Sequence, residues 1–203
     1  MLQDETCFFL AVDFDKEGWR EDAGAFLKTC RAMGIPAVLE RSRSGQGGHV
    51  WFFFEEAITA ASARRLGSFV LTESMECRPD LGFGSYDRFF PNQDTLPHGG
   101  FGNLIALPLQ KQPRDLGNSV FLNDQMVPHE DQWSFLSSVQ RMTRTNVEDL
   151  VYQNKHQNPL LLSPICRLWR RVSSKVLPSQ PDAPPGYFSP RDSARSASTA
   201  SSS

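Results

Sequence analysis

The stretch 7-CFFLAVDFD-15 decides how the chain folds, because it joins a continuous apolar run to a pair of acids. The run is typical of a buried β-strand, and we predict a strand over residues 7–14. Asp13 and Asp15 stand two positions apart, so a strand would direct both carboxylates to the same side. Such like charges repel and lose hydration, and a bound cation would remove both costs. Carboxylates that cap the next turn or face water are the alternative interpretation.

Outward from this strand, the spacing of apolar residues predicts an alternation of helices and strands. Helices are expected over residues 21–34, 58–77, 131–142 and 145–154. Further strands are expected over residues 37–42, 49–56, 86–92, 103–109 and 119–123. The order β-α-β-β-α-β-β predicts an α/β (α+β) fold, in which helices pack on a mixed sheet of the ferredoxin or RRM type.

Composition describes a soluble globular protein. The chain has 203 residues, of which 39% are hydrophobic and 22% charged, enough for one domain with a real core. It contains no apolar run of about 18 residues, and the segment MLQDETCFF does not resemble a signal peptide. The four cysteines form no CxxC pair, which favours free thiols. We therefore expect a cytoplasmic protein that does not contact a membrane.

The sequence changes character near residue 156. Seven prolines follow, and the chain ends in SARSASTASSS. We predict a folded domain over residues 1–155 and a Pro/Ser/Arg-rich tail over 156–203, mostly disordered, with a short helix expected over 160–171. Residues 159–203 hold six Lys or Arg and two Asp, a net charge of +4, which leaves −6 for residues 1–158 of the total of −2. Any nucleic-acid binding must therefore depend on a local site.

The second candidate site is the glycine-rich segment 41-RSRSGQGGHVW-51. Its glycines allow the backbone to approach a ligand closely and to offer N–H groups to an anion, although a strand rather than a helix follows. A hairpin loop with an incidental histidine is the alternative. The candidate phosphate contacts are Arg41, Arg43, Ser44, Gly45, Gly47, Gly48 and His49.

The third candidate site lies in 85-SYDRFFPNQD-94. Asp87 falls within a short apolar strand, where an unpaired charge needs a reason, and Asp94 follows in a loop where turn chemistry would explain it. A third carboxylate beside Asp13 and Asp15 would complete a site for Mg²⁺ or Mn²⁺ of the kind used in phosphoryl transfer. Lys111 and Arg114 could contact a triphosphate, or simply be solvated at the surface.

Three features in this order resemble the archaeo-eukaryotic primase (primase-polymerase) superfamily: the acid pair, the SGxGxHxW segment, and the FPNQD…GGFGNLIALPLQ block. The match is closest to the primase domain of TOTE conflict systems and spans about residues 6–140. It implies a nucleotidyltransferase that uses Mg²⁺ or Mn²⁺ to add nucleotides to a 3′-hydroxyl on a DNA or RNA template. Asp13, Asp15 and Asp87, with Asp94 in reserve, would bind the metal, and Ser44 and His49 would contact the nucleotide's phosphates.

The same resemblance implies nucleoside triphosphates as substrates, and a helicase domain or subunit as partner in a conflict, defence or DNA replication system. Two other functions stay open. The chain begins almost on its first catalytic strand, so it could be a catalytically dead, nucleotide- or nucleic-acid-binding fragment. The same acids could also serve a metal-dependent nuclease or phosphatase. DNA against RNA synthesis, and the choice of ribonucleotide or deoxynucleotide, are not decided by the sequence.

Overall fold

A five-stranded sheet organises the computed structural model, which describes residues 1–96, 100 and 102–156. In space the strands run in the order β4-β1-β3-β2-β5. They are β1 (Thr6–Phe14), β2 (Val38–Arg41), β3 (Gly48–Thr59), β4 (Tyr86–Phe90) and β5 (Val120–Leu122). The predicted tail and its helix over 160–171 lie outside the described residues, and the domain boundary at residue 155 stays a prediction.

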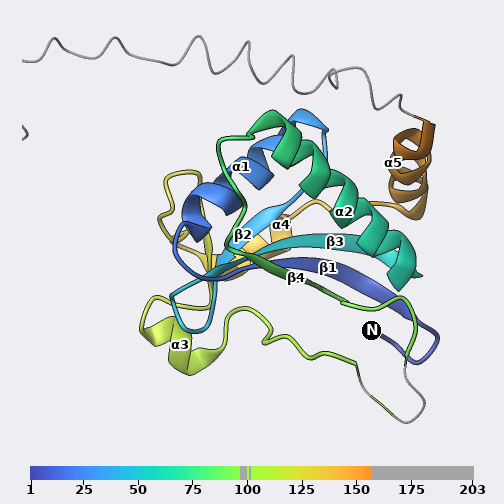
Figure 1. Ribbon diagram of the computed structural model, residues 1–203. Coiled ribbons are helices and arrows are strands. Elements are labelled where there is room, and N and C mark those ends of the chain that lie inside the picture. The colour runs from blue at the N-terminus through green and yellow to red at the C-terminus, as the bar shows by residue number, and fades with distance from the viewer. Residues whose placement is uncertain (97–99, 101, 157–203) are drawn as a thin grey trace, which may run out of the picture.

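Helices cover one face of this sheet (Figure 1). Helix α1 (Trp19–Ala32) and helix α2 (Ala60–Cys77) lie side by side on it, and α5 (Arg144–His156) packs beside α2. Their apolar sides and the facing strand residues form the main core, which contains Leu10, Phe14, Phe26, Phe52 and Leu66. The α/β class with helices packed on a single sheet is thereby confirmed.

The chain order and the strand order together define a ferredoxin-like sheet, as predicted. Strands β2 and β3 form a hairpin, and β3 lies between β1 and β2 in the sheet. All four ladders of the sheet are antiparallel. We expected a mixed sheet. Parallel pairing in the part of the chain that the structure describes is limited to one isolated bridge, Phe54 with Met142.

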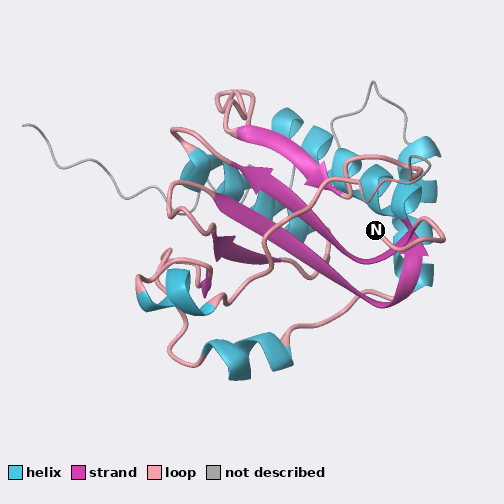
Figure 2. Cartoon of the chain, turned by 90° about the horizontal axis from the view of Figure 1, so that it is seen from below, coloured by secondary structure: helices cyan, strands magenta, loops and turns pink. Residues whose placement is uncertain are grey.

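The strand predicted over residues 103–109 does not form. Instead this segment crosses the second face of the sheet as an irregular loop, seen from below in Figure 2. Pro108 lacks an amide hydrogen, and Leu109 bends the chain with a φ of 64°, so no ladder can continue through them. Ile105 and Leu109 pack there on an aromatic cluster that includes Trp51 and Phe121.

Two short helices follow this loop, α3 (Lys111–Asp115), which the sequence did not predict, and α4 (Gln132–Ser138). No helix among the described residues is long and apolar enough to cross a membrane. Cys7 and Cys30 are buried free thiols. Cys77 is disulfide-bonded, so the prediction of free thiols is wrong for this residue.

Candidate active-site cleft

A row of charged side chains crosses four strands near one end of the sheet. Asp13 on β1 pairs directly with Arg88 on β4 and with His49 on β3, and His49 in turn pairs with Glu40 on β2. Directly paired residues in antiparallel strands present their side chains on the same face. The register therefore places Arg88, Asp13, His49 and Glu40 side by side, with charges that can alternate in sign.

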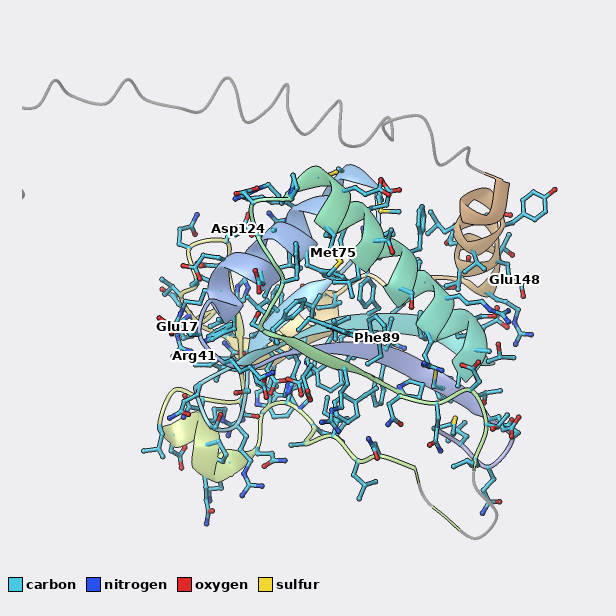
Figure 3. All side chains as sticks on the ribbon, in the orientation of Figure 1. Glu17, Arg41, Met75, Phe89, Asp124 and Glu148 are labelled. Atoms are coloured by element: carbon cyan, nitrogen blue, oxygen red, sulfur yellow. The ribbon has the colours of Figure 1, made fainter. Side chains whose placement is uncertain are left out.

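A cleft of about 1010 Å³ opens over the middle of this row, where Asp13 and His49 line it. Its charged lining residues are Asp13, Asp15, Lys16, Glu17, Arg20 and Arg43. The glycine-rich loop forms one wall with Ser42, Ser44 and Gly47, and residues 104–106 form another. Figure 3 labels Glu17, one of the residues that line the cleft, and Arg41 near the same end of the sheet. Acids and cations thus share one solvent-open site.

The carboxylates of Asp13 and Asp15 lie in unfavourable surroundings in this cleft. Burial raises the pKa of Asp13, and the nearby carboxylates of Asp15 and Asp87 raise it further, while His49 and Arg88 act in the opposite direction. Asp15 Oδ1 is buried without a hydrogen-bond partner, and Lys16 Nζ lies 3.8 Å from it. A divalent cation would relieve both the repulsion and the unsatisfied oxygen, so this pair fits Mg²⁺ or Mn²⁺.

The backbone of Asp15 is fixed by a buried contact between α1 and the segment before β4. The Asp15 amide donates to the carbonyl of Ser85 at 2.8 Å. Ser85 in turn donates from its hydroxyl and its amide to Asp22 Oδ2, at 2.6 and 3.2 Å. Asp22 and Ser85 are both buried. The acid-bearing turn is therefore anchored from two other elements.

Glycine is required where the loop approaches this turn. A Cβ on Gly47 would lie 2.6 Å from the carbonyl oxygen of Phe14, and one on Gly48 would lie 2.6 Å from the Trp19 ring. The loop is closed by a hydrogen bond from the Ser42 amide to the Gly47 carbonyl at 2.9 Å. The Ser44 hydroxyl accepts from the Gln46 amide at 3.2 Å. This packing brings the loop against the acids.

The structure divides the predicted phosphate contacts into two groups. Those that line the cleft are Arg43, Ser44, Gly47 and His49. Those outside its lining are Arg41, Gly45, Gly48, Lys111 and Arg114. Arg41 points toward β5 and donates to the carbonyls of Gly117 and Met126, at 3.0 and 3.5 Å. Lys111 begins α3, and Arg114 lies over the Trp133 ring at 5.7 Å.

Asp87, the predicted third carboxylate, lies near Asp13 but does not line the cleft. Asp87 is close enough to raise the pKa of Asp13, but it forms an ion pair with Arg88 and lines a separate small pocket with Arg64. Asp94 does not line the cleft and forms an ion pair with Arg64 at 2.5 Å. Among the described residues, no group of three or more His, Cys, Asp or Glu is arranged to hold a metal ion.

Sequence reasoning missed Lys16, Arg20 and Glu40. Lys16 follows Asp15 directly, and Arg20 comes at the end of the segment DFDKEGWR, so their positive charges close to the acid pair were a usable signal. The Arg20 guanidinium lies over the Trp19 ring at 4.6 Å. Glu40 interrupts the apolar strand AVLERS as an acid buried beside His49. These residues add two cations to the cleft and a carboxylate behind its histidine.

Fold and cleft together define a class: two-layer α/β domains whose ferredoxin-like sheet carries paired carboxylates and cationic side chains at a strand end. The protein-family model that describes the archaeo-eukaryotic primase domain of TOTE conflict systems matches residues 1–150. The chain belongs to this family. No curated protein matches the chain. Family membership confirms the resemblance seen in the sequence and supports a primase-type nucleotidyltransferase role in a conflict system.

Proposed function

We propose that this protein is a metal-dependent primase-polymerase, which joins a nucleoside triphosphate to the 3′-hydroxyl of a nucleic-acid strand. The observation that carries the proposal is the cleft, where Asp13 and Asp15 face His49 and the loop residues Arg43 and Ser44. In the reaction, the hydroxyl oxygen bonds to the α-phosphorus, the bond to pyrophosphate breaks, and the hydroxyl proton passes to water. Catalysis of this transfer is largely positioning and electrostatic stabilisation.

Asp13 and Asp15 are the residues that would hold Mg²⁺ or Mn²⁺. When bound, the ion neutralises charge that develops on the phosphates and leaving oxygens. Asp87 on the neighbouring strand is the proposed third carboxylate, and to serve it must exchange its ion pair with Arg88 for the metal. Asp94, already paired with Arg64, stays in reserve. The raised pKa of Asp13 is consistent with this role, because a cation favours the charged carboxylate.

The triphosphate would lie along the cationic side of the cleft. Lys16, Arg20 and Arg43 supply positive charge, and the glycine-rich loop supplies the Ser44 hydroxyl. His49 Nε2, which lies 3.4 Å from Asp13 Oδ1, is placed to donate to a phosphate oxygen next to the metal site. The metal ion and these cationic side chains would thus neutralise the negative charge of the phosphates and of the protein carboxylates.

A DNA or RNA template, a helicase domain or subunit, and action in the cytoplasm complete the proposal. These features follow from the family role and not from the cleft. The net charge of −6 over residues 1–158 makes general attraction to nucleic acid weak, so template binding would depend on local contacts and on the bound nucleotide.

The proposal is tested by primer extension on DNA and RNA templates, with Mg²⁺ or Mn²⁺ and each set of nucleotides. We expect extension by the wild type and its loss in Asp13→Ala and Asp15→Ala. Asp80→Ala is the matched control, because Asp80 is exposed and pairs with Arg78 away from the cleft. Extension that survives both cleft variants would contradict the proposal. Nucleotide binding without any product would indicate an inactive fragment, and mononucleotide release would indicate a nuclease.

A further inference from the structure

Glu40 is a carboxylate buried in the sheet, with its side chain 1% exposed. It accepts three hydrogen bonds from side chains of other strands and loops. Oε2 accepts from the Trp51 indole at 2.8 Å and lies 3.0 Å from His49 Nδ1. Oε1 accepts from the Ser119 hydroxyl at 3.2 Å. Every donor that reaches this carboxylate therefore comes from an element that borders the cleft or supports it.

We propose that Glu40 is a positioning residue, which holds the His49 ring so that Nε2 faces Asp13 and the bound triphosphate. This inference rests on the proposed function of the cleft. An indole nitrogen only donates, so Oε2 is fixed as an acceptor, and the His49 nitrogen beside it must carry a hydrogen. The hydrogen bond at Nδ1 sets the orientation of the ring and turns Nε2 toward Asp13 and the cleft. A ring that carries hydrogens on both nitrogens can donate to Glu40 and to a phosphate at the same time.

The cost of burying Glu40 argues against a purely structural role. A buried carboxylate loses its hydration, and an apolar side chain of similar volume commonly serves a core equally well. Here the charge stands in the row Arg88, Asp13, His49 and Glu40, directly behind the imidazole. Its position matches that of a carboxylate that orients a functional histidine.

The third hydrogen bond extends this control to the cleft wall. Ser119 accepts the Leu109 amide on its carbonyl at 2.8 Å, and so anchors the end of the segment whose residues 104–106 line the cleft. Glu40 thereby links His49 to that segment through Ser119. One buried side chain fixes the histidine and the wall opposite it.

The first experiment measures the affinity for ATP and dATP with Mn²⁺ by calorimetry, and the melting temperature of each variant. Glu40→Ala is expected to raise the dissociation constant about ten-fold. Glu40→Gln should restore most of the affinity, because its amide oxygen can replace Oε2. Glu73→Ala is the matched control: Glu73 is also a buried carboxylate but lies on α2, outside the cleft lining. Equal loss of affinity in the Glu40 and Glu73 variants, or none in Glu40→Ala, would overturn the inference.

A double-mutant cycle shows whether Glu40 acts through the histidine. In a His49→Ala background, the Glu40→Ala substitution should have no further effect on nucleotide affinity. Additive losses would mean that Glu40 acts independently of His49, which overturns the proposal.

Nitrogen NMR of the imidazole supplies a readout that needs neither nucleotide nor folded variants. The wild type should show a hydrogen held on His49 Nδ1, and Glu40→Ala should lose it. A wild-type protein whose His49 Nδ1 carries no hydrogen would overturn the inference, even if Glu40→Ala failed to fold. If the wild type binds no nucleotide yet shows the hydrogen on His49 Nδ1, the proposed function fails while the positioning of His49 stands.

Discussion

Arg41 at the end of β2 and Arg43 in the glycine-rich loop carry the same guanidinium group but lie in different surroundings. Arg43 is exposed and lines the cleft, whereas Arg41 donates to two backbone carbonyls, one before β5 and one after it. We expect Arg43→Ala to raise the dissociation constant for ATP about five-fold, because a charge-assisted contact to phosphate is lost. Its melting temperature should be unchanged. The measurements are calorimetry and thermal unfolding.

Arg41→Ala is the paired variant and should behave in the opposite way. Loss of its hydrogen bonds should lower the stability by about 1–2 kcal/mol, with little change in nucleotide affinity. If Arg41→Ala weakened binding while leaving the melting temperature unchanged, Arg41 would be a phosphate contact after all, as the sequence alone suggested.

At the scale of elements, the cleft exists because the glycine-rich loop packs closely against the end of β1. Gly47→Ala would place a methyl group 2.6 Å from a backbone oxygen of Phe14, which cannot move without shifting the strand. We expect this variant to lose about 1–3 kcal/mol of stability and to bind nucleotide more weakly. Urea denaturation and calorimetry measure the two effects.

Gly82→Ala serves as the control, since a Cβ there meets nothing within 4 Å. It should leave both quantities as in the wild type. A Gly47→Ala protein with wild-type stability and affinity would show that the loop does not need this close approach.

At the scale of the whole molecule, α5 extends the helical layer beyond the β-α-β-β-α-β unit. Val147 on α5 is fully buried in the main core, which also includes Met142 before the helix. Val147→Ala should lower the free energy of unfolding by about 2 kcal/mol, because it removes two buried carbon atoms and leaves a cavity. Chemical denaturation measures the change, and nucleotide affinity should be unaffected because the helix is outside the cleft lining.

Val127→Ala is the matched substitution at a valine that is 53% exposed. Its unfolding free energy should change by less than about 0.5 kcal/mol. Equal losses at the two valines would mean that α5 is not part of the cooperative core.

The sequence could predict most of the elements because their signals are local. Apolar spacing located β1 and both long helices, and the family motifs drew attention to Asp13 and His49. The prediction over residues 103–109 was wrong because an apolar run is compatible with a strand or with a covering loop. Strand pairing decides between them, and Leu109 with its φ of 64° ends it.

The sequence by itself determined the order of strands and helices from β1 to β4, the acids at the end of β1, and the glycines of the loop. Each of these follows from spacing within a few residues. Only the tertiary structure decided that Arg88, Asp13, His49 and Glu40 form one row, that Arg41 leaves the cleft, and that Asp87 pairs with Arg88. The reason is physical: cross-strand register and side-chain direction depend on contacts between distant segments, which local periodicity does not encode.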